Sequence, residues 1–383
     1  MTSHACRACQ SRSGHVVLDL GEQPACDYFP PVTDPGPDPQ YPLQMWLCAR
    51  CGLAQLAADP TVPEEPRGAE PAALVSQATD AVGRAAAAGL LGAGKTVMEY
   101  GSPHGGSWLG LLAERGLAPA ATGERAGVIV DSFGMMHAAD QAQALEERAG
   151  RLSETGVLLL QYHALSAIIR GRQWNALRHA HYAYYSTTAL VGMLAAHDLR
   201  ADRAWHFDLY GGTVLLAASR VAAPGTTSRE TVDALLADDA AVGAVDPGVL
   251  GGLGRDATAG ADGLRAWLTE HRLRGRRVVG YGAASRAVAL LRQAGADSGL
   301  LPAVADAAEA KQGLRMPGTD IPVVSPAELG VRRPDAVLLF LADLRAEVRS
   351  AYPEVEAHGG RWVDADALAG WPGRESGGLK QHA

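Results

Sequence analysis

Four cysteines near the N-terminus constrain the fold of this chain more than any other feature. They form two Cys-x-x-Cys pairs, Cys6 with Cys9 and Cys48 with Cys51. Four thiolates complete the tetrahedral coordination of a structural zinc ion, and each pair makes a turn that directs two sulfur atoms at one ion. We therefore predict a closed zinc site of the zinc-ribbon type, which stabilises the fold and performs no chemistry. The alternative is two unrelated reduced pairs.

The remaining cysteine and the charge of the chain limit its class. Cys26 is predicted to be a buried small apolar residue rather than a ligand. Paired cysteines fit metal ligation in a reducing compartment. Because neither a secretion signal nor a membrane-spanning apolar stretch is evident, we expect a cytoplasmic protein without a membrane segment. The formal net charge of -8 argues against nucleic acid as a partner, since phosphate binding needs a basic face.

The length of the chain predicts more than one domain. A chain of 383 residues exceeds the usual size of a single domain, so two or three are expected. The segment 59–72 is rich in Pro and Glu without periodicity, which is typical of a linker. We therefore predict a zinc-binding module and linker over residues 1–72, followed by domains over 73–227 and 228–383.

Both later domains show strands that alternate with helices. In the first, a helix over 73–91 precedes the strands TVMEYGS, GVIVDS and GVLLLQY, which alternate with helices over 106–116 and 138–153. In the second, residues 228–273 are mainly helical, and the strand RRVVGYGA leads into a helix from Ser285. Such alternation predicts parallel sheets with helices on both faces. The predicted fold class is α/β, with a small zinc-binding module and two Rossmann-like domains.

The segment Gly89 to Thr96, GLLGAGKT, matches the phosphate-binding loop of nucleotide hydrolases letter for letter. Such a loop follows a strand and opens a helix, whereas this one follows a predicted helix and precedes a strand. We therefore reject nucleotide hydrolysis.

Two glycine-containing turns end predicted strands, at the edge where α/β sheets bind ligands. After the second turn, GYGAASR, the amides of a helix N-terminus are available to an anion. A tight strand-to-helix turn without a ligand is an equally good interpretation of that turn. The candidate ligand contacts in the two turns are Gly101, Ser102, Tyr281, Gly282, Ala283 and Ser285.

A cluster of titratable residues forms the segment HAHYAYYS, which is predicted to be a loop. Histidines suit proton transfer near neutral pH, and tyrosines suit stabilisation of an oxyanion. A further histidine follows the strand GVIVDS and is expected at the same carboxyl edge of the sheet. Structural packing is the alternative role for each of them. The candidate catalytic residues are His137, Arg178, His179 and His181, and the candidate contacts are Tyr182 and Tyr184.

The order of these motifs resembles a known family. A four-cysteine module ending in CGLAQL is followed by the EYGS strand, the strand before His137, HAHYAYYS, LYGGTVLL and a terminal GYGA unit. The stretch from Lys311 to Pro326, KQGLRMPGTDIPVVSP, is the most specific part. Over nearly its whole length, the chain resembles the NDP-sugar C-methyltransferases of deoxysugar biosynthesis, which methylate C3 of a 4-keto-deoxysugar nucleotide with S-adenosylmethionine. The resemblance implies a role in secondary metabolism such as antibiotic biosynthesis.

The resemblance implies roles for residues that match the family, and several positions depart from it. His181 matches the family's proposed base, and His137 matches its histidine after the fourth strand. The family's tyrosine and glutamate before the base are Arg178 and Ala180 here, and Gln161 stands where a glutamate is usual. The LYGGTVLL loop begins with tyrosine where the family has histidine. Further candidate contacts from the resemblance are Tyr210, Gly211, Gly212 and Lys311.

A larger departure lies between Gly116 and Val128, where only LAPAATGERAG separates a helix from the next strand. Family members have a longer segment there, which carries the second strand, its acidic end and the third strand. The carboxylate at the second strand accepts the ribose hydroxyls of the adenosyl group, as in dinucleotide folds. We therefore expect a truncated methyltransferase-like domain with greatly weakened affinity for S-adenosylmethionine.

Three functions remain open at this stage. Methylation at C3 of a 4-keto-sugar begins with removal of the C3 proton, so an enzyme without the methyl donor retains enolisation chemistry such as epimerisation or isomerisation. The alternatives are an S-adenosylmethionine-dependent C3-methyltransferase and a non-catalytic scaffold that binds a sugar nucleotide. An NDP-sugar or related small molecule is the expected partner in all three.

Overall fold

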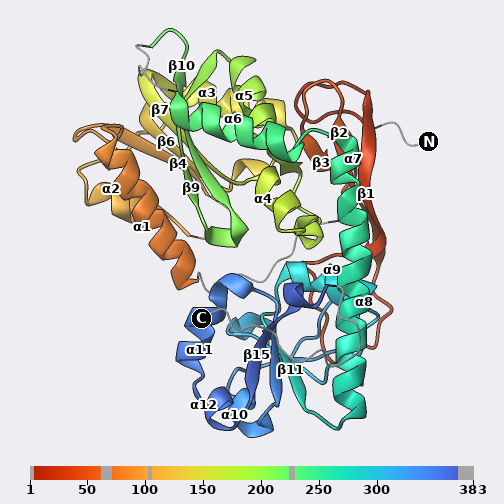
Figure 1. The fold of residues 1–383 in the computed structure, drawn as a ribbon. Coiled ribbons are helices and arrows are strands. Elements are labelled where there is room, and N and C mark those ends of the chain that lie inside the picture. The colour runs from red at the N-terminus through yellow and green to blue at the C-terminus, as the bar shows by residue number, and fades with distance from the viewer. Residues whose placement is uncertain (1–3, 62–70, 102–105, 224–228, 370–383) are drawn as a thin grey trace. The chain divides into compact units, whose positions relative to one another are not determined.

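The computed structural model describes residues 4–61, 71–101, 106–223 and 229–369 (Figure 1). The chain divides into two compact units, one of Met1–Glu22 with Tyr41–Gly254, and the other of Gln23–Gln40 with Arg255–Ala383. The domain boundaries predicted at residues 72 and 227 stay predictions. Within the described ranges, no helix combines the length and the apolar character that crossing a membrane requires.

A four-stranded sheet in the order β1-β2-β3-β8 contains the N-terminal strands. Its strands are β1 (Gly14–Pro24), β2 (Gln40–Cys48), β3 (Ala54–Leu56) and β8 (Ala183–Tyr184). Strands β2 and β3 pair antiparallel, and β3 pairs antiparallel with β8, with Ala54 opposite Tyr184 and Gln55 opposite Ala183. The segment HAHYAYYS was predicted to be a loop, but it contributes a short strand because β3 offers its backbone groups to a partner.

The second sheet has six strands in the order β5-β4-β6-β7-β10-β9. Strands β5, β4, β6 and β7 are parallel, as predicted, and β10 pairs antiparallel with both β7 and β9. The strands are β4 (Thr96–Gly101), β5 (Ala118–Pro119), β6 (Ala126–Ser132), β7 (Leu152–His163), β9 (Leu199–Phe207) and β10 (Thr213–Arg220). The shortened segment after Gly116 thus retains a two-residue second strand, which corrects the expectation that this strand is missing.

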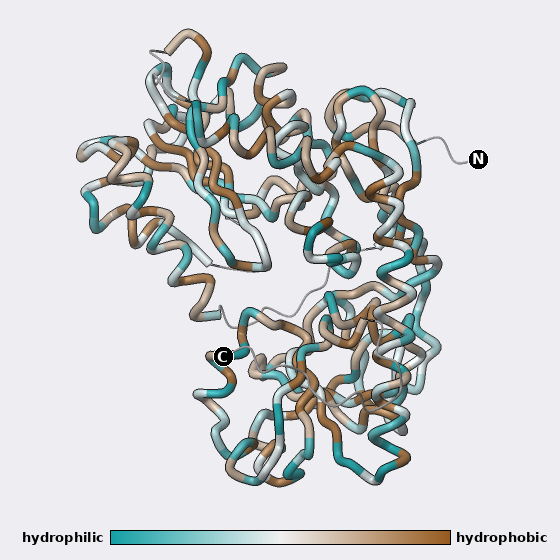
Figure 2. Tube along the Cα trace, viewed as in Figure 1, coloured by the Kyte–Doolittle hydropathy of each residue, from teal (hydrophilic) through white to brown (hydrophobic). Residues whose placement is uncertain are grey.

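Helices cover both faces of the six-stranded sheet. They are α1 (Ala72–Ala87), α2 (Leu109–Ala113), α3 (Gln141–Arg151), α4 (Leu165–Arg170), α5 (Thr187–Ala195) and α6 (Glu230–Val242). The central strand β6 divides its side chains between two cores, since Ile129 belongs to one and Val128 and Val130 to the other. Figure 2 shows the apolar central strands of this sheet in brown. Burial on both faces explains why Val128–Val130 is a continuous apolar run.

Residues before the third sheet are helical, as predicted, in α7 (Pro247–Leu250) and α8 (Gly252–Leu273). The third sheet is fully parallel, in the order β13-β12-β11-β14-β15. This is a doubly wound order, in which ligands bind at the carboxyl ends of the strands. Its strands and helices are β11 (Val278–Tyr281), α9 (Ser285–Gln293), β12 (Val304–Ala305), β13 (Val323–Val324), α10 (Glu328–Arg332), β14 (Ala336–Leu339), α11 (Arg345–Ala351), α12 (Glu354–Ala357) and β15 (Arg361–Asp364).

Candidate functional site

The four paired cysteines form one cluster. Their sulfur atoms lie within 4.8 Å of one another, with 3.5 Å between Cys6 Sγ and Cys51 Sγ and 3.6 Å between Cys9 Sγ and Cys48 Sγ. Tetrahedral zinc–thiolate bonds of about 2.3 Å place sulfur atoms slightly under 4 Å apart, so these residues fit the ion. The hydrogen bond between Cys6 and Cys51 lowers the pKa of Cys6 to about 5 and raises the pKa of Cys51, so the thiolate is favoured on one sulfur of this pair. The cluster supports structural zinc, as predicted.

The fifth cysteine lies outside this cluster. Cys26 is buried, as predicted, and its thiol donates a hydrogen bond to Asp27 Oδ1 at 3.3 Å.

The candidate catalytic histidines meet at the carboxyl edge of the six-stranded sheet. His137 lies on a 3₁₀-helix, η1 (Met135–His137), just after β6, as predicted. Its ring packs edge-on against His181, with 4.5 Å between ring centroids. Arg178 Nε donates to His181 Nε2 at 2.8 Å. Because a guanidinium only donates, this bond requires an unprotonated His181 Nε2, which is the form that a general base needs.

The other candidate residues of this segment lie around the pair. The hydroxyl of Tyr184 accepts a hydrogen bond from the backbone N–H of Arg178 at 3.0 Å. His179 is buried, and its Nε2 lies 3.4 Å from Pro42 O. Tyr182 is half-buried, and the guanidinium of Arg7 lies over its ring. The roles of these three residues in binding or catalysis stay predictions.

Ala180, between the two histidines, has the left-handed backbone conformation with φ of 64°. The N–H of Ala180 donates to Asp59 Oδ2 at 2.6 Å, and the carbonyl oxygen of Ala180 lies 2.9 Å from His137 Nδ1. An alanine in this conformation needs support from its surroundings. Asp59 was assigned to the linker, and its role was not predicted because no local pattern signals a contact so distant in sequence.

A buried ion pair holds the turn that carries His137. Asp131, at the end of β6, pairs with Arg148 of α3 at 2.5 Å, and both side chains are almost fully buried. The other carboxylate oxygen accepts from the N–H of Met135 at 2.9 Å. Burial raises the pKa of Asp131, and the neighbouring guanidinium opposes that rise.

Replacing Arg148 with methionine is expected to destabilise the protein by about 3–5 kcal/mol at neutral pH, because it leaves the buried Asp131 carboxylate without its partner. A pKa raised in the folded state means that protonation favours folding, so part of the loss should return as pH falls through that pKa. Urea unfolding at pH 7 and pH 5 measures both effects. The matched double variant, Asp131→Asn with Arg148→Met, removes both charges and should lose less; an equal loss would contradict this account.

The loop with Gly211 and Gly212 forms the turn between β9 and β10, at the same edge of the sheet as His137. It contains the 3₁₀-helix η3 (Leu209–Gly211), where Tyr210 has φ of 57°. The Tyr210 ring lies 6.1 Å from Phe133 and 6.4 Å from His163, which ends β7. Gly212 has no room for a side chain, because a Cβ there would lie 2.4 Å from Ala167 Cβ. His163 was not predicted as a site residue. Its position at the end of a buried strand is the signal that could have identified it.

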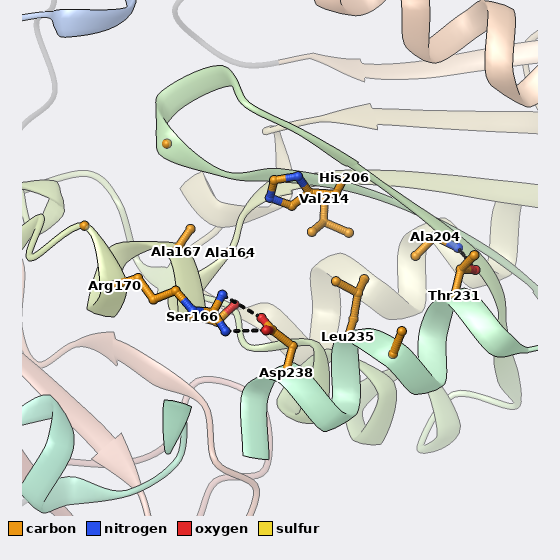
Figure 3. A pocket seen from close by; sticks show the side chains of 13 residues that line it. Ala164, Ser166, Ala167, Arg170, Ala204, His206, Val214, Thr231, Leu235 and Asp238 are labelled. Carbon is orange, nitrogen blue, oxygen red and sulfur yellow. Dashed lines mark hydrogen bonds and ion pairs between the residues drawn. The ribbon is translucent and has the colours of Figure 1, made fainter. Parts of the chain in front are cut away.

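A cavity of about 760 Å³ lies beside this turn, between α4, α6 and the β9–β10 strands (Figure 3). One wall carries a bidentate ion pair of Arg170 and Asp238. The cavity includes Gly211, and none of the four candidate catalytic residues lines it. It is lined by Ala164, Ser166, Ala167, Arg170, Gly171, Ala204, His206, Gly211, Val214, Thr231, Ala234, Leu235 and Asp238.

The turn after β4 was predicted to contact a ligand. Gly101 ends β4, whereas Ser102 lies outside the described residues. Glu99 caps the start of α2 by accepting from the N–H of Trp108 at 2.6 Å. The residue after β5 is Ala120, whose N–H donates to Val97 O. An alanine thus directly follows β5, and the Glu124 carboxylate closes the same turn by accepting from the N–H of Ala121 at 2.9 Å.

In the C-terminal unit, the predicted turn follows β11. Gly282 has φ of 92°, which glycine adopts readily. The N–H of Ala283 donates to Asp306 Oδ2 at 2.6 Å. Asp306 directly follows β12, the place where dinucleotide folds carry a ribose-binding carboxylate, and the sequence prediction missed it. The Tyr281 ring is buried against Trp362, and burial raises its pKa.

The two remaining candidates of this unit are buried. Ser285 is the first residue of α9. Lys311 Nζ donates to Ala283 O at 3.0 Å and lies 4.9 Å from the centroid of the Phe29 ring. Lys311 thus stabilises the turn after β11, and contact of this turn with a nucleotide stays a prediction.

Comparisons with known proteins agree with the resemblance. The family model described as C-methyltransferase C-terminal domain matches residues 208–365, and a zinc binding domain model matches residues 6–64. The C-methyltransferase NovU of Streptomyces niveus is 26% identical over 232 residues, which cover 59% of this chain and 54% of that protein. The match thus spans about half the length of this curated relative.

Two solved methyltransferase structures are similar to part of the chain. One is magnesium protoporphyrin IX methyltransferase from Synechocystis PCC 6803 with bound SAH, with a TM-score of 0.30 and 10% identity over 39% of this chain and 84% of that chain. The other is an O-methyltransferase family protein from Burkholderia thailandensis, with a TM-score of 0.28 and 14% identity over 39% of this chain and 57% of that chain.

Proposed function

Because the chain belongs to the NDP-deoxysugar C-methyltransferase family, we propose that it enolises a nucleotide-linked 4-keto-deoxysugar without S-adenosylmethionine. The observation that carries this proposal is the contact of Arg178 Nε with His181 Nε2. It supplies an unprotonated imidazole and a permanent positive charge side by side. A base and a cation are the two groups that enolate formation requires.

The proposed reaction is a proton transfer at the carbon next to the carbonyl group. His181 Nε2 accepts the proton from C3, and the electrons of the broken C–H bond form an enolate whose negative charge resides on the carbonyl oxygen. Arg178 leaves the imidazole and donates to that oxygen. Return of the proton from His181 to the same face gives the starting sugar. Delivery of a proton from solvent water to the opposite face gives the epimer, and His181 then releases its proton to solvent. No oxidant or second substrate is needed.

The site near β4 supports a reaction without the methyl donor. Ala120 directly follows the short strand β5, and the Glu124 carboxylate at this turn accepts from the N–H of Ala121, so its Oε2 is already engaged by the backbone. With that oxygen engaged, the adenosyl group loses part of its polar recognition. This weakened recognition supports the proposal that S-adenosylmethionine is not a co-substrate.

Proton exchange in deuterated water tests the proposal directly. The protein is incubated with an NDP-4-keto-6-deoxysugar in D₂O, without S-adenosylmethionine, and the sugar is analysed by NMR and mass spectrometry. We expect loss of the C3 proton signal and a gain of one mass unit. Product that forms only when S-adenosylmethionine is added, with no exchange in its absence, would overturn the proposal.

A second candidate is an S-adenosylmethionine-dependent methyltransferase, favoured by the retained strand order β5-β4-β6-β7 and by Gly101 at the end of β4. Calorimetric titration with S-adenosylhomocysteine separates the two functions. We expect no binding heat up to about 1 mM, which corresponds to binding weaker than about -4 kcal/mol. Micromolar affinity would instead support this second candidate.

A further inference from the structure

Arg7 lies inside the first cysteine pair, between Cys6 and Cys9. Its backbone N–H donates to Gln55 Oε1 at 2.8 Å, and its side chain is half-buried rather than solvated. From this position it contacts both segments that carry the histidines of the candidate site.

The first contact is with the segment that carries His137. The carbonyl oxygen of Arg7 accepts from the N–H of Gln141, the first residue of α3, at 3.0 Å, and Arg7 Nη1 donates to Ala139 O at 2.9 Å. The Arg7 carbonyl thereby satisfies an N–H of the helix N-terminus, which has no partner within the helix. Gln141, fully buried, donates in turn to the carbonyl of Met135 at 2.8 Å. Arg7 is therefore connected by hydrogen bonds to the turn that ends at His137.

The second contact is with the segment that carries His181. The Arg7 guanidinium lies 4.6 Å from the centroid of the Tyr182 ring, and its Nε donates to Leu56 O at 3.2 Å. The N–H of Leu56 in turn donates to the carbonyl of Tyr182 at 3.1 Å. Because Tyr182 directly follows His181, Arg7 is connected through Leu56 to the backbone beside the proposed base.

We infer that Arg7 is a positioning residue, which holds the turn with His137 and the segment with His181 in register from within the four-cysteine cluster. The cluster thereby has a second role beyond folding its own module. The inference rests on the proposed function for the importance of the histidines, whereas the contacts of Arg7 are independent of it. A flexible side chain of similar length without donors retains the packing and the backbone hydrogen bonds to Gln55 and Gln141. It loses the side-chain hydrogen bonds to Ala139 O and Leu56 O and the charge over the Tyr182 ring.

The test compares Arg7→Met with Arg50→Met. Arg50 is the matched control, because it lies inside the second cysteine pair and is exposed. In full-length protein with equal zinc content, we expect Arg7→Met to accelerate amide hydrogen exchange in residues 135–142 and 178–185 by about 10- to 100-fold. The turnover number for C3 deuterium exchange should fall by about 10- to 100-fold while KM changes little. Arg50→Met should match the wild type in both measurements.

Each other outcome decides against the inference. Unchanged amide exchange in Arg7→Met at full zinc content would overturn it, and so would faster exchange spread over β1 and β2 with loss of zinc, because that pattern indicates only a structural role. If Arg7→Met does not fold, Arg7→Lys serves in the same test, with a smaller change expected in the same two segments. Absence of C3 exchange in the wild type would count against the proposed function alone, since amide exchange still decides the role of Arg7.

Discussion

His181→Ala is expected to reduce C3 deuterium exchange of an NDP-4-keto-6-deoxysugar by about 100- to 10,000-fold, the usual contribution of a positioned general base. The imidazole is buried against His137 and held by Arg178. Alanine leaves no other atom of that side chain to accept the proton. The turnover number is measured by NMR in D₂O, with KM determined in the same series.

The control for this prediction is His358→Ala, which removes an exposed histidine after α12. We expect wild-type exchange from it. The unfolding temperature of His181→Ala is measured in parallel, so that a loss of activity is compared at equal folded fraction. Exchange at the wild-type rate in folded His181→Ala would remove this residue from the mechanism.

The parts of the fold that could be predicted are those with a strong local pattern. The apolar run at Val128–Val130 is a strand buried on both faces, and such a run has few other interpretations. The two cysteine pairs likewise indicated one metal cluster, since four soft ligands at one module have one common use. The predicted helix 138–153 and α3 (Gln141–Arg151) differ only at their ends, where Asp140 caps the helix by accepting from Gln143 N–H.

The parts that could not be predicted depend on contacts between distant segments. Strand β8 has only two residues, and it exists because β3 pairs with it. Residues 23–40 belong with the C-terminal unit, where Asp38 forms a buried ion pair with Arg315 at 2.6 Å. An ion pair between residues so far apart in sequence has no periodicity and no local spacing to reveal it.

The candidate site divides in the same way. His137 was placed at the sheet edge because it directly follows a strand, and strands of a parallel sheet end at one edge. The hydrogen bond from Ala180 to Asp59 could not be predicted. Alanine rarely adopts the left-handed backbone conformation that Ala180 has here, so the sequence gives no sign of it. The candidate site residue His137 therefore had a clearer local signal than the contact between Asp59 and Ala180 that supports it.

Cys48→Ser is expected to abolish stoichiometric zinc binding and to unfold the four-stranded sheet. Cys48 is buried and ends β2, and its sulfur lies 3.6 Å from that of Cys9. A serine hydroxyl is a poor zinc ligand, so the tetrahedral set loses one member. Structural zinc contributes about 10–16 kcal/mol of apparent binding free energy in zinc-finger peptides, so the expected loss exceeds that of the other variants described above. Metal analysis and thermal unfolding measure it.

Cys26→Ser is the matched control for this loss. Its thiol is outside the cluster and donates to Asp27, and a serine hydroxyl can donate in the same way. We expect it to retain one zinc ion per chain and a nearly unchanged unfolding temperature. The contacts from Arg7 to Gln141 and Leu56 begin inside the cluster, so loss of zinc should also release the segment that carries His181. Stoichiometric zinc in Cys48→Ser, or its loss from Cys26→Ser, would show that the ligand set is a different one.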